Sequence, residues 1–186
     1  MRICYLNLNP SSYTVGIPAR DAVYLRGLKE NGVEILECQD DSPGLSKFIR
    51  LYKKHKDLRG KYDVMLVGYT AYILVPFARL ISNKKVVFNA LCSLYEGIVI
   101  SREKTSRFSF QGLYAWLIDF IAFNSAHLSL LESEEQVKFV ASKFFILKNK
   151  LLKSWTGVDD FLFYSDPDAK KITTFTVLFR GAFLPE

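Results

Sequence analysis

Short runs of consecutive apolar residues alternate with longer amphipathic stretches along the chain. Buried strands are predicted over 3–8, 33–38, 62–68, 85–91, 128–131 and 150–154, and helices over 18–31, 45–59, 71–81, 108–126 and after Ser133. This alternation is typical of βα units. Right-handed crossovers then predict an α/β fold with a doubly wound, mainly parallel, Rossmann-like sheet, helices on both faces and the strand order 3-2-1-4-5-6.

Helix boundary signals support these elements. Pro18 suits the first position of a helix and Gly32 the position just past its end. Ser133 and Gln136 form a capping-box pair ahead of the last helix. Pro76 either kinks the helix over 71–81 or marks its true start.

The end of the chain departs from the βα pattern. Asp166, Pro167 and Asp168 form a polar break, and an apolar strand is predicted over 174–179, shortly before the last residue. We therefore expect two parts. Residues 1–165 form a Rossmann-like domain, and residues 166–186 form a linker and the first strand of a missing C-terminal domain.

Composition narrows the class of protein. With 49% hydrophobic and 24% charged residues, the chain is globular rather than disordered. The excess of 25 Lys and Arg over 19 Asp and Glu gives a net charge of +6 and favours anionic partners such as phosphates, nucleotides or anionic lipid. The helix over 45–59 carries a basic face, either solvated or in contact with anionic lipid. It lacks the motifs and exposed aromatics of a nucleic-acid binder, so no nucleic-acid partner is expected.

The number and spacing of cysteines and histidines argue against disulfide bonds and metal sites. Cys4, Cys38 and Cys92 are far apart with no Cys-x-x-Cys motif, and there are two histidines in all. This pattern predicts buried thiols in a reducing compartment and no metal cluster. With no signal peptide and no apolar run of roughly 18 residues, we expect a cytoplasmic protein, or one peripheral to the inner face of the membrane.

Candidate chemistry lies in the loops that follow the predicted strands. The first loop has Gly16 but no Gly-x-Gly-x-x-Gly fingerprint, which excludes an NAD or FAD oxidoreductase. Gly16 either lets backbone amides approach an anion or simply turns the loop. The helix over 108–126 either docks on a bilayer or is buried against the sheet.

Polar side chains follow the strand over 85–91, where an α/β sheet usually binds its ligand. They would line a cleft suited to sugar hydroxyls, unless they are an ordinary polar loop, and comprise Asn89, Ser93, Tyr95 and Arg102. Glu132 and Ser133 follow the next strand at the same edge and are further cleft candidates, with Ser133 expected to cap its helix. His127 opens a strand and is expected to be structural rather than a catalytic base.

Several short passages carry a family resemblance. They are KVVFNALCSLYE over 85–96 with Ser101-Arg102 after it, AHLSLLES over 126–133, WTGVDDF over 155–161 and the tail VLFRGAFLPE over 177–186. Together they resemble the N-terminal half of a retaining family-4 glycosyltransferase, a group with two facing Rossmann-like domains (GT-B fold). Asn89, Ser101 and His127 each stand where the family pattern has aspartate.

The resemblance implies an enzyme of glycan biosynthesis, a nucleotide-sugar-dependent hexosyltransferase that retains anomeric configuration. The missing C-terminal domain would bind the nucleotide-sugar donor without a metal, and this domain would bind no cofactor itself. Its loops would bind a sugar or lipid-linked acceptor through Gly16, Asn89, Ser93, Tyr95 and Arg102. The fragment alone is expected to be inactive.

An alternative to the glycosyltransferase hypothesis is a protein without enzymatic activity. The chain would then be a non-catalytic α/β binding module whose basic surface docks on a membrane or a protein partner. On either hypothesis, an anionic membrane surface is a candidate partner, with weak, salt-sensitive binding expected from the basic face of residues 47–59.

Overall fold

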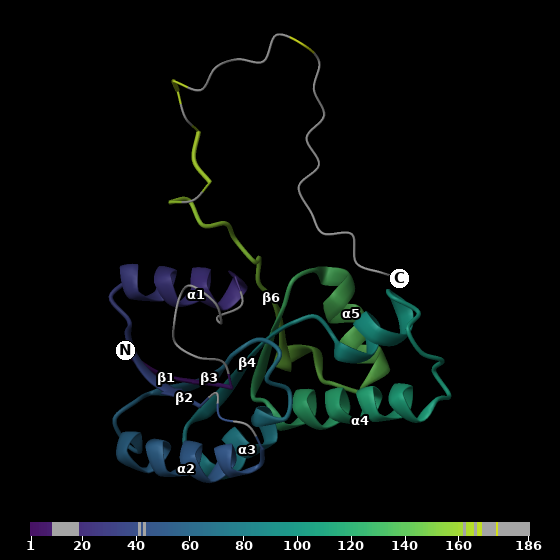
Figure 1. Ribbon diagram of the computed structural model, residues 1–186, viewed down its shortest axis with the longest axis horizontal. Helices are drawn as coiled ribbons and strands as arrows, with labels where there is room; N and C mark the ends of the chain where they lie inside the picture. The colour runs from purple at the N-terminus through teal and green to yellow at the C-terminus, as the bar shows by residue number, and fades with distance from the viewer. Residues whose placement is uncertain are drawn as a thin grey trace.

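The computed structural model describes residues 1–8, 19–40, 42, 44–161, 163–165, 167–168 and 174. Six strands form one sheet: β1 (Arg2–Asn7), β2 (Glu34–Gln39), β3 (Val64–Val67), β4 (Lys85–Leu91), β5 (Leu128–Leu131) and β6 (Leu151–Lys153). All neighbouring strands pair in parallel (Figure 1). The predicted α/β class with a parallel sheet is confirmed.

The predicted strand order is wrong in one respect. The sheet runs β2-β1-β3-β4-β5-β6, so β3 pairs with β1 and β2 lies at an edge. Glu34 and Glu37 are exposed on β2, which suits an edge strand, whereas β3 is buried along most of its length and suits an interior position. Periodicity predicts where strands occur, but not which strands become neighbours.

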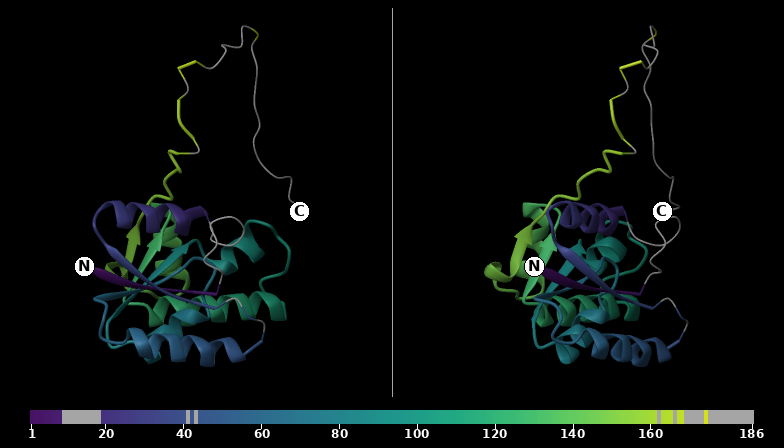
Figure 2. Two further views of the ribbon diagram at one scale, coloured as in Figure 1. Left: turned by 60° about the vertical axis from the view of Figure 1, so that its left-hand side comes forward. Right: turned by 90° about the vertical axis from the view of Figure 1, so that its left-hand side faces the viewer.

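Helices cover both faces of the sheet (Figure 2). α1 (Ala19–Glu30) lies on one face, and α2 (Ser46–Leu58), α3 (Leu74–Ile81) and α4 (Phe110–Ser125) lie on the other. α5 (Glu134–Lys143) packs against β5 and β6, and a five-residue π-helix, η1 (Glu96–Ile100), follows β4. A short 3₁₀ turn, η2 (Lys148–Lys150), leads into β6. This layering places the carboxyl ends of β1, β3 and β4 at one edge.

Two apolar cores hold these layers together. The larger one lies between the sheet and α2, α3, α4 and α5, and aromatic rings cross it: Phe88 and Phe123 have ring centroids 5.8 Å apart, as do Phe123 and Phe144. The smaller core, between the sheet and α1, contains Ile3 and Leu25. Burial of this apolar area is the main force that fixes the helices on the sheet.

The helix boundary signals are confirmed at Gly32, Pro76 and the Ser133 cap, whereas the predicted capping box is half formed, because Gln136 Oε1 has no hydrogen-bond partner among the described residues. The Ser133 hydroxyl accepts a hydrogen bond from the Gln136 amide at 3.2 Å and caps α5. Gly32 follows α1 with φ +75°, a left-handed conformation that glycine adopts without strain. Pro76 lies in the first turn of α3, so it marks the start of the helix rather than a kink.

The cysteines are not bridged, and His127 is hydrogen-bonded to a neighbouring strand. The three cysteines are free, with Cys4 and Cys38 buried and Cys92 half-buried. His127 lies at the start of β5, and its Nδ1 accepts a hydrogen bond from the Val86 amide at 2.9 Å. Burial lowers the pKa of His127 below its ordinary value, which favours this neutral, accepting form.

Within the described residues, no helix has both the length and the apolar character needed to cross a bilayer. The predicted strand over 174–179 lies outside the described residues except for Thr174. The division at residue 165 therefore stays a prediction.

Candidate functional site

Two different regions meet at the carboxyl edge of the sheet. The first, here called the polar cluster, lies on the α1 side and consists of Tyr5, Asn7, Arg20, Asp21 and Asn89, all buried. The second, here called the apolar groove, lies on the α4 side and is described below. Parallel α/β sheets bind ligands at this edge because the loops that leave the strands converge there.

Asp21, in the first turn of α1, is the centre of the polar cluster. Its Oδ2 accepts hydrogen bonds from the Tyr5 hydroxyl at 2.8 Å, Asn7 Nδ2 at 3.2 Å and the Tyr69 amide at 2.9 Å, and its Oδ1 accepts from Asn89 Nδ2 at 2.5 Å. Burial raises the pKa of Asp21, and the hydrogen bonds from Tyr5 and Asn89 oppose that rise. The positive pole of α1 also favours a carboxylate at this position.

Arg20 ties α1 to the strands that follow. Its Nε donates to Asn89 Oδ1 at 2.7 Å, and its terminal nitrogens donate to Thr156 Oγ1 and to the Ser154 carbonyl, each at 3.0 Å. The side chain is also stacked over the Tyr24 ring, 4.9 Å from its centroid. Both ends of the Asn89 amide are therefore engaged, one by Arg20 and one by Asp21.

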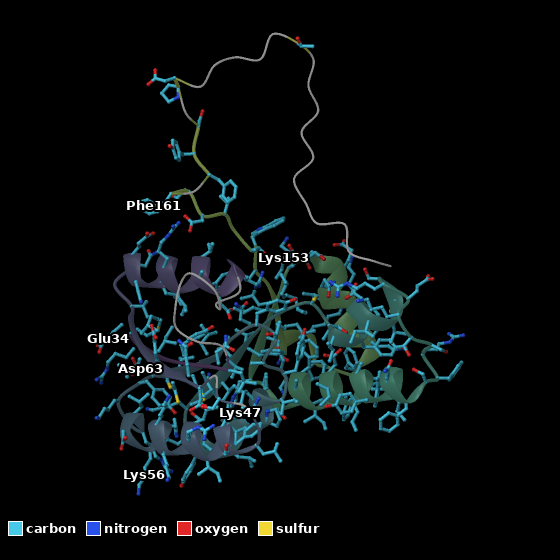
Figure 3. The ribbon with its side chains drawn as sticks, viewed as in Figure 1. Glu34, Lys47, Lys56, Asp63, Lys153 and Phe161 are labelled. Atoms are coloured by element: carbon cyan, nitrogen blue, oxygen red, sulfur yellow. The ribbon has the colours of Figure 1, made fainter. Side chains whose placement is uncertain are left out.

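The next turns of α1 hold the segment that follows β6. Arg26 pairs with Asp159 at 2.6 Å and with Asp160, and its guanidinium lies 4.7 Å from the centroid of the Phe161 ring, beside α1 in Figure 3. Gly157 reverses the chain just before these contacts, with φ +76°. The passage over 155–161, which contains the Gly-Val-Asp of the family resemblance, is thus held against α1.

Gly68, directly after β3, is required by the polar cluster. A Cβ atom at this position would lie 2.4 Å from Asn7 Nδ2, 2.6 Å from Asp21 Oδ2 and 2.6 Å from the Tyr5 hydroxyl. No side chain fits there unless the cluster shifts. Gly68 therefore lets backbone approach the buried carboxylate closely enough for the Tyr69 amide to donate to it.

The apolar groove is a hollow of about 280 Å³ on the other side of the edge. Its walls are mostly apolar and include Leu8, Ile73, Leu94, Ile98, Tyr114 and Ile118. The buried Ser93 and the exposed cation Arg102 also line it. Concave apolar walls with a few polar groups are typical of ligand sites.

Strained backbone borders the groove. Thr70, after β3, has φ +66°, and Leu91, at a register shift at the end of β4, has φ +64°. For residues with a Cβ this conformation costs about 1–2 kcal/mol. Such strain is concentrated at functional edges, because a turn there must aim the following residues in a set direction. Here these residues are Ala71 and Cys92, which both line the groove.

Asp119, buried in the middle of α4, fixes the floor of the groove. Its carboxylate accepts from the Ser93 hydroxyl at 2.7 Å, the Tyr95 amide at 2.8 Å and the Leu94 amide at 3.2 Å. These bonds hold the turn that leads into η1. Burial raises the pKa of Asp119 to about 6.

The structure does not bring the predicted site residues together in one site. Ser93 and Arg102 both line the apolar groove, although the Ser93 hydroxyl is bound to Asp119. Tyr95 is buried and faces Lys143, whose Nζ lies 4.7 Å from its ring centroid. Gly16 lies outside the described residues.

The remaining predicted residues lie near the polar cluster or after β5. Asn89 belongs to the polar cluster itself. Glu132 is exposed, and its Oε1 accepts from the Thr156 hydroxyl at 3.3 Å, which connects it to Arg20 through Thr156. Ser133 caps α5. Contact of any of these residues with an acceptor stays a prediction.

Sequence reasoning missed Arg20, Asp21 and Asp119. Arg20 and Asp21 open the helix that follows the first strand, so topology alone places them at the carboxyl edge. Asp119 is the lone charged residue within Phe110–Ser125, an otherwise strongly apolar helix. A single charge in such a helix signals a specific buried partner. Among the described residues, no group of three His, Cys, Asp or Glu side chains could hold a metal ion.

Comparison with known proteins gives the fold but not a family. No family model matches the sequence, and no curated protein matches it. Crystal structures of Anabaena Alr3699/HepE, in complex with UDP and with UDP and glucose, match with a TM-score of 0.51 and 14% identity over 90% of this chain and 47% of theirs. The chain thus spans about half the length of HepE, with which it shares its fold.

Proposed function

We propose that this chain is the N-terminal, acceptor-side domain of a retaining, nucleotide-sugar-dependent glycosyltransferase with two facing Rossmann-like domains. The observation that carries the proposal is the likeness to about half of HepE, whose structure holds UDP and glucose. These two molecules are the parts of a nucleotide-sugar. The sequence passages over 85–96 and 155–161 point to the same class of enzyme.

The two regions of the carboxyl edge take different roles in this proposal. The apolar groove receives the acceptor, with Arg102 as the charged contact. The polar cluster fixes α1, whose N-terminus faces the second domain and helps to neutralise the diphosphate as it leaves the donor sugar. The donor binds mainly to the second domain, and no metal is required.

Transfer of sugar tests the proposal. The first step is to ask whether the reading frame continues past Glu186 into a second Rossmann-like domain with a Glu-x7-Glu pair. The two-domain protein is then incubated with radiolabelled UDP-glucose and other nucleotide sugars, with membrane lipids and soluble sugars as acceptors. We expect transfer by the two-domain protein and none by residues 1–186 alone. Transfer by neither protein to any acceptor would contradict the proposal.

The alternative, a non-catalytic binding module, is favoured by the exposed apolar surface of α4 described below. It predicts binding to a membrane or protein partner with no dependence on a nucleotide sugar. A reading frame that ends near Glu186 together with such binding would favour the module over the enzyme.

A further inference from the structure

α4 exposes a continuous row of large apolar side chains, here called the apolar stripe. It comprises Phe108, Phe110, Leu113, Tyr114, Leu117 and Ile121, which are between 39% and 86% exposed. Spacings of three and four residues place the helical members on one side of α4. The opposite side is buried and carries Gly112, Ala115 and Asp119. A helix with apolar residues on both sides needs a partner for its outer side.

The start of the apolar stripe is held in place by its own contacts. The Ser109 hydroxyl accepts from the Gly112 amide at 3.0 Å and caps α4, and it lies 2.6 Å from the Thr105 hydroxyl. A Cβ at Gly112 would come within 2.5 Å of the Ser106 carbonyl oxygen. The chain before α4 is therefore packed tightly against the first turn. Phe108 and Phe110 are nevertheless 86% and 84% exposed.

Cations surround this end of the apolar stripe. Arg102, Lys104 and Arg107 are all exposed, and within the described part of the chain none of them forms an ion pair. Arg107 lies over the Phe108 ring, 5.0 Å from its centroid. Aromatic rings beside cations suit the headgroup layer of an anionic bilayer, where the rings enter the acyl boundary and the cations meet phosphates.

The apolar groove extends to the same surface. A second hollow, lined by Lys104 and Phe110, shares Leu94, Ile98, Arg102 and Tyr114 with the apolar groove. An apolar path therefore leads from the stripe to the carboxyl edge of the sheet.

We propose that the apolar stripe, with Arg102, Lys104 and Arg107, docks on an anionic lipid bilayer, and that the apolar groove opens toward that bilayer. α4 lies in the plane of the membrane surface. If the proposed glycosyltransferase function holds, on which this last step rests, the acceptor is an anionic lipid whose apolar chain enters the groove.

Co-sedimentation with vesicles tests the apolar part of this surface. The full chain is mixed at low salt with vesicles of phosphatidylglycerol and phosphatidylcholine, or of phosphatidylcholine alone. We expect binding to the anionic vesicles, at least tenfold weaker for the double variant Phe108→Ser, Phe110→Ser. The matched control is Phe145→Ser, Leu147→Ser, which removes two residues that are 78% and 68% exposed in the turn after α5. The control should bind like the unchanged protein.

A second pair of variants tests the charges. Arg102→Gln, Lys104→Gln, Arg107→Gln should weaken binding by about tenfold or more, since each cation near an anionic surface contributes about fivefold. The control replaces Lys61, Lys84 and Lys148, which precede strands at the opposite edge, with Gln. Leu117 belongs to the apolar stripe, so the Leu117→Trp change in a Trp116→Phe, Trp155→Phe background reports, through quenching by brominated lipid, whether α4 itself meets the bilayer.

Several results would overturn the proposal. They are no binding of the unchanged chain to anionic vesicles at low salt, equal losses in the stripe and control variants, no quenching in the Leu117→Trp variant, or capture of a protein by the stripe without vesicle binding. Failure of the glycosyltransferase function is a separate result. Vesicle binding without sugar transfer would contradict the enzyme alone, and transfer to soluble acceptors without vesicle binding would contradict the docking surface alone.

Discussion

The polar cluster and the apolar groove lie at the same edge of the sheet, one on the α1 side and the other on the α4 side. In the polar cluster, Asp21 accepts four hydrogen bonds and Arg20 donates three, so these buried charges are matched within the protein. In the apolar groove, the walls are apolar and Arg102 is exposed. The cluster therefore holds elements of the fold together, whereas the groove has the open apolar walls that we propose bind a ligand.

Substitutions in the two regions should therefore have different effects, on the stability of the fold in the polar cluster and on binding in the apolar groove. When one member of a buried hydrogen-bonded cluster is removed, its former partners stay buried without hydrogen bonds. The free energy of unfolding therefore falls. Replacement of an exposed residue at the groove should leave the fold nearly unchanged and, on the proposed function, alter binding there. The buried Asp119 is the exception on the groove side, because it joins the groove floor to α4.

The largest effect is expected from Asp21→Ala. The change leaves donors of Tyr5, Asn7 and Asn89 without their acceptor and removes the nearby negative charge that interacts with the buried Arg20. We expect the free energy of unfolding to fall by about 3–5 kcal/mol in a urea titration. Asp57→Ala, at an exposed position of α2, should change it by less than about 0.5 kcal/mol. Similar small losses for both variants would show that the cluster is not a structural centre.

The next effect is the pH dependence that Asp119 gives to stability. Its pKa is about 6 in the folded protein and 3.8 ordinarily, so the folded state binds this proton more tightly than the unfolded chain. The stability from Asp119 is therefore fully present below about pH 4 and is lost as the pH rises through about 6. The total change is about 3 kcal/mol.

Asp119→Asn isolates this contribution because asparagine does not titrate there. The free energy of unfolding of the unchanged protein, minus that of the variant, should fall by about 3 kcal/mol between about pH 4 and pH 7. Other carboxylates, Asp21 among them, cancel in this difference. For Asp57→Asn, at an exposed position, the difference in free energy of unfolding should hardly change with pH. A flat difference for Asp119→Asn would mean that the hydrogen bonds from Ser93, Leu94 and Tyr95 fully offset the effect of burial on its pKa.

A smaller loss is expected from Gly68→Ala. The added methyl group would overlap Asn7, Asp21 and Tyr5, and displacing them should cost about 2 kcal/mol in the same urea titration. The control is Gly27→Ala in α1, where a Cβ meets nothing within 4 Å. That change should stabilise the protein by up to about 1 kcal/mol, because alanine favours helix over glycine. Equal effects of the two substitutions would contradict the close approach at Gly68.

Much of the fold was predictable from the sequence because its signals are local. Apolar runs gave β4 and β5 at their observed bounds, Gly32 marked a helix end, and Pro76 and Ser133 marked helix starts. The strand order was not predictable in the same way. Whether β2 lies at an edge or inside depends on packing across the whole sheet, and the exposed Glu34 and Glu37 are only a weak local sign of it.

The candidate site was predictable in place but not in detail. Topology put Asn89, Ser93 and Arg102 at the carboxyl edge, where the structure has them. It gave no sign that Asn89 bridges Arg20 and Asp21, because those contacts join residues about 70 positions apart in the chain. Hydrogen bonds of that kind follow from tertiary packing, which a single sequence does not specify.

The smallest effect is expected at α2, whose basic face was the membrane contact predicted from sequence. Lys47 and Lys56 mark this helix in Figure 3. Two of its cations are already engaged: Arg50 lies 3.1 Å from Asp40, and Lys54 donates to the Gln39 carbonyl. Lys53, Lys56 and Arg59 are exposed and, with the half-buried Lys47, carry the remaining attraction.

Lys53→Gln, Lys56→Gln should therefore weaken binding to anionic vesicles by about twofold at low salt. The effect should vanish at about 0.5 M salt, where screening shortens the reach of surface charge to a few ångströms. The matched comparison is Arg102→Gln, Lys104→Gln on the same vesicles, for which a larger loss is expected because these cations adjoin the apolar stripe. If the α2 pair proves the more damaging of the two, the docking surface belongs to α2, where Ile49 and Tyr52 are also exposed.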